Sequence, residues 1–279
     1  MTDRYAVFGK PVTHSRSPDI HAAFAAQTGE ALEYAKVQVE PGAFVDCARS
    51  FFAEGGKGLN ITLPFKTEAF DFADTLTERA QRAGAVNTLA KQSDGSILGD
   101  NTDGIGLVRD ILNNLSWQIA DKRILILGAG GAVRGVLEPL LSQAPASLVI
   151  ANRTVEKAEK LAEDFSDLGQ IRGNGFAELA EFSPFDIVIN ATSASLAGEL
   201  PPLPEAVVSK HSCAYDMMYG AEPTIFLNWM AQQGLDHLAD GLGMLVEQAA
   251  ESFYLWRGVR PKTQTLIASL RKTLSAKKS

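Results

Sequence analysis

Hydrophobic and polar positions alternate between two patterns in the first part of the chain. Short apolar runs of the kind seen in buried strands lie at residues 5–9, 34–39 and 58–66. Helical patterns occupy residues 17–29 and 42–56. Ser17, Pro18 and Gly29 predict the N-cap, the first residue and the end of the earlier helix. Alternating strands and helices predict an α/β layer architecture with parallel strand pairing.

The pattern changes in the middle of the chain and then starts again. In residues 84–103, two short strands flank "SDG", which predicts a β-hairpin that ends in the polar cluster "GDNTD". A helix is expected from about Gly104. A second α/β series starts at Arg123 with a strand, a glycine turn and a helix, and Pro139 should kink or shorten that helix. Further strands are expected at 148–152, 186–192 and 215–220, with helices at 154–165 and from Gly243 onward.

Composition narrows the possible functions. The 279 residues are 46% hydrophobic, which is enough for one large domain or two ordinary ones. Lys plus Arg number 26 and Asp plus Glu 33, and the net charge of −7 disfavours binding to nucleic acids or anionic membranes. Cys47 and Cys213 lie far apart, in no metal-ligand spacing, which suits free thiols in a reducing compartment. With no apolar leader and no stretch long enough to span a membrane, we expect a soluble cytoplasmic protein without a bound metal.

The stretch "ILILGAGGAV" indicates a dinucleotide site. It places Gly128, Gly130 and Gly131 directly after an apolar strand, where glycines let the backbone turn tightly and approach a pyrophosphate. The helix that begins there offers free N–H groups and the positive end of its dipole. Val133 replaces the third glycine of the usual pattern. A tight connection that binds no ligand is the alternative interpretation of this motif alone.

The next strand, in "LVIANRT", ends without the acid that an NAD site would carry. An Asp or Glu there would bond a ribose 2′-hydroxyl and repel a 2′-phosphate. Asn152 and Arg153 occupy the place instead, and Thr154 and Lys157 follow. Arg153 offers a planar fork of donors for phosphate, and Lys157 adds a second positive charge. The pattern favours NADP over NAD, and a solvated Arg and Lys at a helix start is the alternative.

Several polar residues predict a substrate site. Ser15 and Ser17 flank Arg16 at a strand-to-helix turn, where hydroxyls and free N–H groups suit a carboxylate. Helix capping by Ser17 is an equally valid interpretation. Gln248 lies beside the apolar stripe of the C-terminal helix, where its amide can reach a ligand.

The motif "NITLPFK" adds a polar face and a lysine. In a strand, Asn60 and Thr62 share one face, which is either an exposed edge or a ligand wall. Lys66 follows an apolar turn, and Asn87 and Asp103 lie at the two ends of the hairpin segment. A Lys66–Asp103 pair would hold the lysine in its charged form. A lone solvated lysine is the alternative from the sequence alone.

Taken together, the motifs resemble shikimate dehydrogenases over nearly the whole chain. They are "FGKPVTHSRSP" (8–18), "GLNITLPFK" (58–66), "AGAVNTL" (83–89), "GDNTDG" (99–104), "GAGGAVRG" (128–135), "NRT" (152–154), "NATS" (190–193), "YDMMY" (215–219) and "DGLGMLVEQAA" (240–250). The resemblance implies an α/β fold of two domains with a cleft between them. These are an N-terminal substrate-binding domain, residues 1–103 with helices 242–279 packing back, and a Rossmann-type NADP-binding domain, residues 104–241. From the pattern alone, the final helices could belong to either domain.

The resemblance also assigns roles to residues. Lys66 and Asp103 match the catalytic pair. The implied substrate contacts are Ser15 and Ser17, for a carboxylate, and Asn60, Thr62, Lys66, Asn87, Asp103, Tyr219 and Gln248. The implied NADP contacts are Glu78, Gly128, Ala129, Gly130, Gly131, Ala132, Asn152, Arg153, Thr154, Lys157, Met217 and Gly241. The second phosphate-binding position of the family is often arginine, and Lys157 lacks its bidentate fork.

The activity implied is NADP-dependent reduction of 3-dehydroshikimate to shikimate, a reversible step of aromatic amino-acid and chorismate biosynthesis. Lys66 would donate a proton to the ketone oxygen or polarise it, and Asp103 would orient Lys66. The implied partner is this small-molecule substrate, with a monomer or homodimer as the assembly. Two alternatives stay open: a dual quinate/shikimate dehydrogenase, and a non-catalytic NADP-binding sensor, against which the presence of both Lys66 and Asp103 argues.

Overall fold

The structure is a computed structural model that describes the chain except for residues 1, 193, 195–197 and 277–279. It divides into two compact units. The first comprises Met1–Gly106 and Val246–Leu266, and the second comprises Leu107–Leu245 and Ile267–Ser279. The chain therefore passes from one unit to the other inside α5 (Asp103–Arg109), inside α9 (Leu242–Arg257) and inside α10 (Gln264–Ala276). Most of α10 belongs to the second unit by its contacts. The substrate-binding and NADP-binding domains predicted from the sequence are functional assignments, and their bounds stay a prediction.

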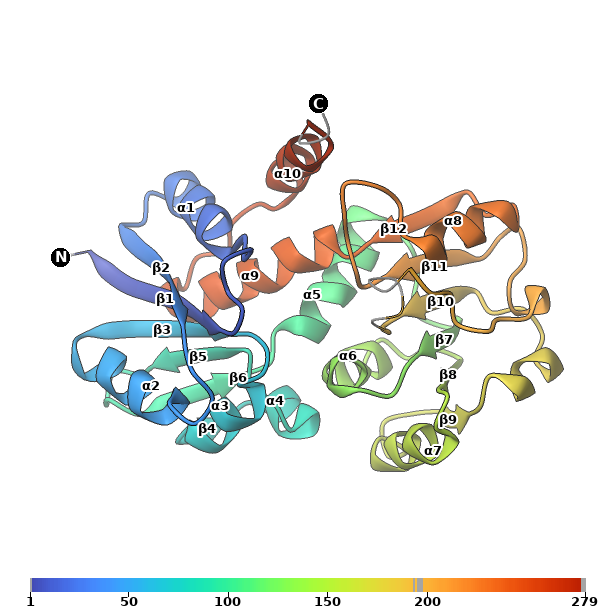
Figure 1. Ribbon diagram of the computed structural model, residues 1–279, viewed down its shortest axis with the longest axis horizontal. Coiled ribbons are helices and arrows are strands. Elements are labelled where there is room, and N and C mark those ends of the chain that lie inside the picture. Colours follow the sequence, from blue (N-terminus) through green and yellow to red (C-terminus); the bar gives the residue numbers. More distant parts are fainter. Residues whose placement is uncertain (1, 193, 195–197, 277–279) are drawn as a thin grey trace. The chain divides into compact units, whose positions relative to one another are not determined.

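The first unit is built on a mixed sheet (Figure 1). Its strands, in the order β2-β1-β3-β5-β6-β4, are β2 (Leu32–Gln38), β1 (Asp3–Gly9), β3 (Gly56–Ile61), β5 (Thr88–Lys91), β6 (Ile97–Asp100) and β4 (Thr75–Leu76). β1 pairs in parallel with β2 and β3, as the alternation predicts. β5 pairs antiparallel with both β3 and β6, which confirms the "SDG" hairpin.

Helices cover both faces of this sheet. They are α1 (Ser17–Thr28), α2 (Phe44–Ala53), α3 (Lys66–Phe72), α4 (Glu78–Ala83) and the later part of α9. Leu59 and Ile61 of β3 face the core that contains Phe44 and Phe52 of α2. Asn60 points to the opposite face, where it contacts side chains of α1 and α9.

The start of α1 differs from the sequence prediction. Ser17 is the first helical residue and not the N-cap, which is Arg16, a residue whose side chain caps nothing. The hydroxyl of Ser15 accepts the hydrogen bond of the Ser17 N–H at 3.2 Å, so Ser15 takes the role that the pattern gave to Ser17. The predicted end is confirmed, because Gly29 closes the helix in the left-handed conformation with φ +74°.

The second unit contains a fully parallel sheet. Its order is β12-β11-β10-β7-β8-β9, formed by β12 (His237–Asp240), β11 (Cys213–Asp216), β10 (Ile187–Asn190), β7 (Arg123–Leu127), β8 (Ser147–Ala151) and β9 (Ile171–Asn174). Counted from β7, this is the order 3-2-1-4-5-6 of the doubly wound Rossmann fold, which confirms the predicted fold class. The order reverses between β7 and β10, and ligands bind outside the carboxyl ends of the strands at such a switch point.

Alternate residues of these strands serve two different cores. Ile124 and Ile126 pack with α6 (Gly131–Leu141) and α7 (Val155–Asp164) on one face. Leu125 and Leu127 pack on the other face with the 3₁₀ turns Ala177–Glu181 and Glu205–Val207 and with α8 (Ile225–Gln232). This burial on both faces explains the continuous apolar runs in the sequence. α6 continues through Pro139 and ends two residues later, at Leu141.

Two glycines allow close packing of α5 and the π-helical turn that follows it, Asp110–Asn114, against α9. A Cβ atom at Gly106 would lie 2.7 Å from the backbone nitrogen of Gln248, and one at Gly243 would lie 1.9 Å from a carboxylate oxygen of Asp110. A side chain at position 106 would push α5 and α9 apart, and one at position 243 would displace the Asp110 carboxylate. Among the described residues, no helix is long and apolar enough to cross a membrane.

Candidate active site

Three segments of the first unit meet at one edge of the mixed sheet. Because β5 runs antiparallel to β3 and β6, the start of β5 lies beside the ends of the other two strands. The carbonyl of Asn87, directly before β5, accepts from the Ile61 N–H at 2.8 Å, and the Asn87 N–H donates to the Asp100 carbonyl at 3.0 Å. The Val86 N–H bonds the carbonyl of Lys66 at 2.9 Å. The backbone thus brings Lys66, Asn87 and the segment after Asp100 together.

Asp103 is shared by two of these segments. Lys66 Nζ donates to Asp103 Oδ2 at 2.5 Å, and Asn87 Nδ2 donates to Asp103 Oδ1 at 2.7 Å. The side chains of Lys66 and Asp103 are 27% and 18% exposed, so the pair is sheltered but reachable. Asp103 also opens α5, where a carboxylate is stabilised by the helix dipole. The Lys66 ammonium is therefore held by Asp103, whose own position is fixed by Asn87.

A buried ion pair lies directly before this acid. The Asp100 side chain is 1% exposed and receives two bonds from the Arg79 guanidinium, at 2.7 and 2.5 Å. Thr77 and the backbone N–H of Asn101 complete its shell at 2.6 and 2.7 Å. Burial alone would lower the pKa of Arg79, but its bonds to Asp100 and Glu251 raise it above the usual value. Arg79 thus ties the end of β6 to α9 through Glu251, at 3.2 Å.

Asn60 lies at the centre of a buried polar network and is 7% exposed. Its Oδ1 accepts from Tyr34 at 2.7 Å and contacts His21 Nε2 at 3.2 Å. Its Nδ2 donates to the hydroxyls of Thr88 and Ser252 at 3.1 and 3.0 Å. Its polar atoms are thus engaged with protein groups, and its role as a direct substrate contact stays a prediction.

The same network reaches other predicted substrate contacts. Thr102 bonds both Asn87, whose Nδ2 donates to its hydroxyl at 3.0 Å, and Gln248 Oε1, at 3.3 Å. Ser252 lies one helical turn after Gln248 and contacts Thr102 at 3.3 Å. Gln248 and Asn87 are therefore brought to one cluster from α9 and the start of β5.

The remaining predicted substrate residues of this unit lie at its edges. The hydroxyls of Ser15 and Ser17 are 3.1 Å apart, so they form one paired group. Thr62 follows β3, and its N–H bonds the Phe8 carbonyl at 2.9 Å. Both serines and Thr62 keep their predicted role as an expectation.

The glycine turn of the second unit forms a cradle at the switch point. Gly128 has φ +106°, and a Cβ there would lie 3.2 Å from Thr192, which follows β10. Cβ atoms at Gly130 and Gly131 would meet nothing within 4 Å, so the backbone there is open to an approaching group. Because α6 begins at Gly131, its free N–H groups and positive dipole end face that space. This geometry fits a pyrophosphate.

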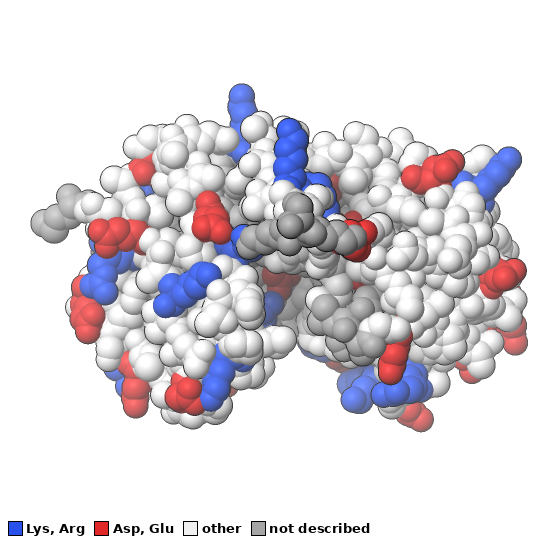
Figure 2. Space-filling view, turned by 45° about the horizontal axis from the view of Figure 1, so that its top comes forward, with Lys and Arg blue, Asp and Glu red and all other residues white. Residues whose placement is uncertain are grey.

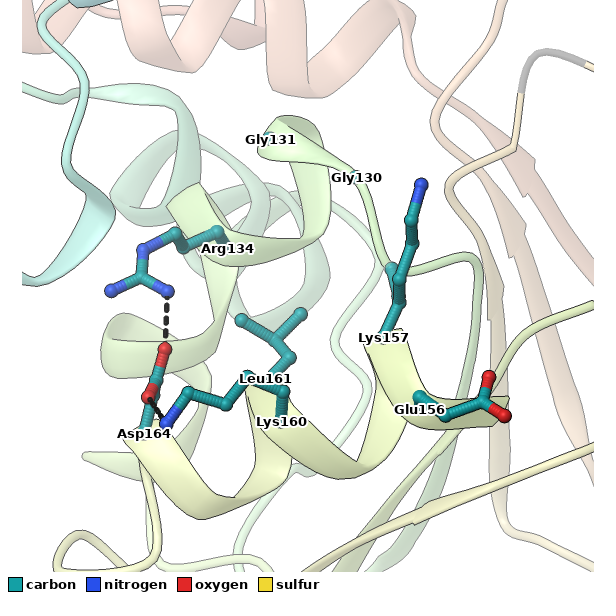
Figure 3. Close-up of a pocket in the computed structure, with 9 residues that line it drawn as sticks. Gly130, Gly131, Arg134, Glu156, Lys157, Lys160, Leu161 and Asp164 are labelled. Carbon is teal, nitrogen blue, oxygen red and sulfur yellow. Dashed lines mark hydrogen bonds and ion pairs between the residues drawn. The ribbon is translucent and has the colours of Figure 1, made fainter. Parts of the chain in front are cut away.

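A pocket of about 350 Å³ lies beside this turn (Figure 3). Its lining includes Ala129, Gly130 and Gly131 together with four charged side chains of α7 and the Arg134 side chain of α6. Figure 3 shows Lys157 extending toward the glycine turn, while Arg134 and Lys160 point to Asp164. Hydrogen bonds from those two cations hold the pKa of Asp164 below its usual range. Among the described residues, no carboxylate pairs with Lys157, so its charge is available to a ligand.

Five further predicted cofactor residues lie in three places. Asn152 donates to the Thr154 carbonyl at 2.8 Å, and Arg153 and Thr154 are exposed. Ala132 lies in the first turn of α6. Glu78 is the first residue of α4 in the first unit, whereas the glycine turn lies in the second. The structure therefore does not group Glu78 with the glycine turn, and its role stays a prediction.

Met217, Tyr219 and Gly241 follow the ends of β11 and β12. A Cβ at Gly241 would lie 2.1 Å from the carbonyl oxygen of Met217, and the Gly241 N–H bonds the Met218 carbonyl at 3.1 Å. Met217 and Gly241 are thus brought together. Tyr219 lies two residues beyond Met217, in the second unit.

Figure 2 shows Lys and Arg interspersed with Asp and Glu on the visible face of each unit. Among the described residues, no cluster of three or more His, Cys, Asp or Glu is placed to hold a metal ion.

Three family models match the chain. They are the shikimate dehydrogenase substrate binding domain over residues 7–89, shikimate / quinate 5-dehydrogenase over 107–198, and the shikimate 5′-dehydrogenase C-terminal domain over 241–271. A curated shikimate dehydrogenase (NADP(+)) of Cellvibrio japonicus is 61% identical over 278 residues, covering 100% of both chains. The chain belongs to the shikimate dehydrogenase family.

Solved structures agree with the family in fold. An Ael1 enzyme from Pseudomonas putida has a TM-score of 0.91 at 49% identity, covering 96% of this chain and 98% of its own. The shikimate 5-dehydrogenase of Thermus thermophilus, crystallised with NADP(H) and shikimate, has a TM-score of 0.86 at 31% identity, covering 98% of this chain and 100% of its own. The two-unit α/β architecture is thus that of the family.

Sequence reasoning missed the supporting layer of the site. Thr88, Thr102, Ser252, His21 and Tyr34 were not predicted, although they surround Asn60 and Asn87. The i, i+4 spacing of Gln248 and Ser252 was the available signal for one of them. The pairing of Arg79 with Asp100 carried no local signal, because the two lie 21 residues apart.

His21 couples this layer to pH. Burial lowers its pKa to about 3, against the opposing effect of its hydrogen bond with Asn60. It stacks on Tyr34 at 4.5 Å, and its Nδ1 has no hydrogen-bond partner among the described residues. The pKa of His21 is about 6.5 in the unfolded chain and about 3 in the folded chain. At pH values between these two, His21 binds a proton only in the unfolded chain. The contribution of neutral, buried His21 to the free energy of unfolding is therefore fully present above about pH 6.5 and is lost as pH falls toward 3.

We predict that the free energy of unfolding drops by about 2 kcal/mol more in the unmutated protein than in His21→Gln between pH 7 and pH 5. Glutamine keeps a donor for Asn60 but has no ionisation in this range. Urea unfolding at both pH values measures the difference, with His211→Gln, at an exposed histidine, as the control. Equal pH dependence in wild type and His21→Gln would show that His21 is not the responsible group.

Proposed function

We propose that this chain catalyses the reversible, NADP-dependent reduction of 3-dehydroshikimate to shikimate. The observation that carries the proposal is the Lys66–Asp103 ion pair braced by Asn87, in a chain of the shikimate dehydrogenase family. The curated relative named above bears the activity in its name. The Thermus thermophilus structure contains both NADP(H) and shikimate.

Lys66 is the group that acts on the reacting oxygen. When a ketone becomes an alcohol, negative charge develops on its oxygen, and an ammonium beside it stabilises that charge and donates a proton. Asp103 holds the ammonium in place, since its carboxylate lies 2.5 Å from Lys66 Nζ. In the direction of shikimate oxidation, the pair receives the hydroxyl proton instead.

Binding of the substrate falls to the polar groups around this pair. The paired hydroxyls of Ser15 and Ser17 hold the carboxylate, and Asn87, Thr62 and Gln248 hold hydroxyl groups. Asn60 also contacts the substrate in this proposal, with its amide held in place by Tyr34, Thr88 and Ser252. Tyr219 is a further proposed substrate contact.

The residues of the glycine cradle suit the cofactor. NADPH, when bound, supplies the hydride. Gly128 to Ala132 and the N-terminus of α6 hold the pyrophosphate, as the open backbone at Gly130 and Gly131 supports. Arg153, Thr154 and Lys157 hold the 2′-phosphate, with Asn152 beside them. No acidic side chain of the described residues pairs with Arg153 or Lys157.

Lys66→Met is expected to lower kcat for shikimate oxidation by about 10²–10⁴-fold, the usual contribution of general acid–base catalysis. The KM for shikimate should change little, because the carboxylate and hydroxyl contacts remain. Steady-state kinetics at saturating NADP measure both. Lys57→Met, at an exposed lysine of β3, is the matched control. Near-normal turnover of the Lys66 variant would remove Lys66 from the reaction.

Arg153→Ala should raise the KM for NADP by about 10–100-fold, since a hydrogen bond to a charged group contributes about 1.5–3 kcal/mol. The KM for shikimate should stay close to that of the unmutated protein. Arg172→Ala, at an exposed arginine of the same unit, controls for a general loss of positive charge. If the unmutated protein used NAD as well as NADP, the phosphate-binding role of Arg153 would be wrong.

The function itself is tested by kcat/KM for shikimate and for quinate, each with NADP and with NAD. Shikimate with NADP is expected to give the highest of the four values. Quinate carries an extra hydroxyl on a saturated ring, so equal values for the two substrates would indicate a dual quinate/shikimate dehydrogenase. Folded protein without activity in any of the four assays would contradict the proposal and favour a sensor role.

A further inference from the structure

The loop between β11 and α8 carries two residues of the proposed site. Met217 and Tyr219 lie in it, and its first part packs against Gly241 through the Met217 carbonyl. The fully buried Asp216 fixes the start of the loop. Its carboxylate accepts from the Met218 N–H at 3.0 Å and from the Thr224 hydroxyl at 2.6 Å.

The outer part of the loop has much less support. Ala221, Glu222 and Pro223 are exposed and line a cavity of about 510 Å³. Side chains beside a cavity lack packing partners on that side. The stretch after Tyr219 therefore depends on discrete polar contacts for its position.

Arg271 of α10 supplies such contacts from across the cavity. Its Nη1 donates to the Gly220 carbonyl at 3.1 Å, and its Nη2 forms an ion pair with Asp240 Oδ1. The Asp240 side chain is 7% exposed and also accepts from the Leu242 N–H at 3.2 Å. One guanidinium thus links the loop to the end of β12 and to the first turn of α9.

We propose that Arg271 is a positioning residue, which holds the 217–222 loop, with Met217 and Tyr219 in it, against Gly241. The catalytic part of this inference rests on the proposed function. Arg271 lies outside the sequence motifs that carry the family resemblance. It acts through Gly220 and Asp240.

The geometry requires arginine at this position. Its planar fork donates in two fixed directions, one to a carbonyl and one to a carboxylate. The ammonium of a lysine is a compact point charge on a flexible stem and fixes neither direction. A lysine in the Arg271→Lys variant should therefore hold the 217–222 loop in place only in part.

Global stability should depend little on Arg271. Its side chain is 41% exposed, so solvent screens part of the ion pair, and the Asp240 carboxylate, which is 7% exposed, keeps its bond from the Leu242 N–H when Arg271 is replaced. The consequence of its loss should be local, in a loop that also lies at the surface. A local loosening is distinguishable from general destabilisation by hydrogen exchange.

The experiment compares Arg271→Met with Lys272→Met, which removes a neighbouring exposed lysine of the same helix. Hydrogen–deuterium exchange of residues 216–224 is measured in ligand-free protein. Arg271→Met should exchange at least about tenfold faster there, which corresponds to about 1.4 kcal/mol of lost protection. Strands β7 and β8 should exchange as in the unmutated protein. Lys272→Met should match the unmutated protein throughout.

Kinetics provide the second arm. Arg271→Met should lower kcat for shikimate oxidation by about tenfold, with a smaller rise in the KM for NADP, because only the Met217 and Gly241 contacts of the cofactor belong to the loosened region while the phosphate contacts of Arg153 and Lys157 are made by other segments. Arg271→Met combined with Asp240→Asn should lower kcat no further than the more damaging single variant, since both changes break one linkage. Additive losses would overturn the coupling of the two residues.

The outcomes separate this inference from the proposed function. Unchanged exchange of residues 216–224 in Arg271→Met overturns the inference, whatever the activity. Faster exchange with unchanged kcat shows a purely structural role and also overturns it. If the unmutated protein oxidises no shikimate, the proposed function fails, and the exchange measurement alone then decides whether Arg271 holds the loop.

Discussion

The site depends on one shared carboxylate. Asp103 accepts from Lys66 on one oxygen and from Asn87 on the other, so the lysine is aimed by an acid that cannot rotate freely. Asn87 is in turn fixed by backbone bonds to β3 and β6, and Asp100 anchors the approach to Asp103. Buried polar groups of this kind are costly unless every partner is present. The positions of Lys66 and Asp103 are therefore set by hydrogen bonds to groups that are themselves held.

The two units use charge in opposite ways. In the first, cations and carboxylates are matched and sheltered, as in Arg79–Asp100 and Lys66–Asp103. In the second, Arg134 and Lys160 are matched by Asp164, whereas Lys157 and Arg153 are left exposed near a helix N-terminus. Such exposed cations suit a ligand that brings its own negative charge and can leave again.

Local pattern was sufficient for much of the fold. The apolar runs at Ile124–Leu127 and Leu148–Ile150 predicted buried parallel strands because both of their faces are covered. The N-cap predicted for α1 was wrong. The turn before the helix decides whether the Ser15 or the Ser17 hydroxyl accepts a helix N–H, and this turn has no clear sequence pattern. Lys66 and Asp103 were singled out by resemblance, and their contact across 37 residues has no periodic signature. Ser252 lies 192 residues from Asn60, so only the tertiary structure shows that they meet.

The enclosure of Asn60 has a consequence for how such a site can change during evolution. A substitution there would remove the buried hydrogen bonds that Asn60 makes with Tyr34, Thr88 and Ser252, and the chain would lose stability before it gained a new ligand contact. The half-exposed Thr62 carries no such penalty. New substrate preferences can thus arise by substitution of half-exposed residues of the site, while the buried residues around Asn60 stay nearly unchanged.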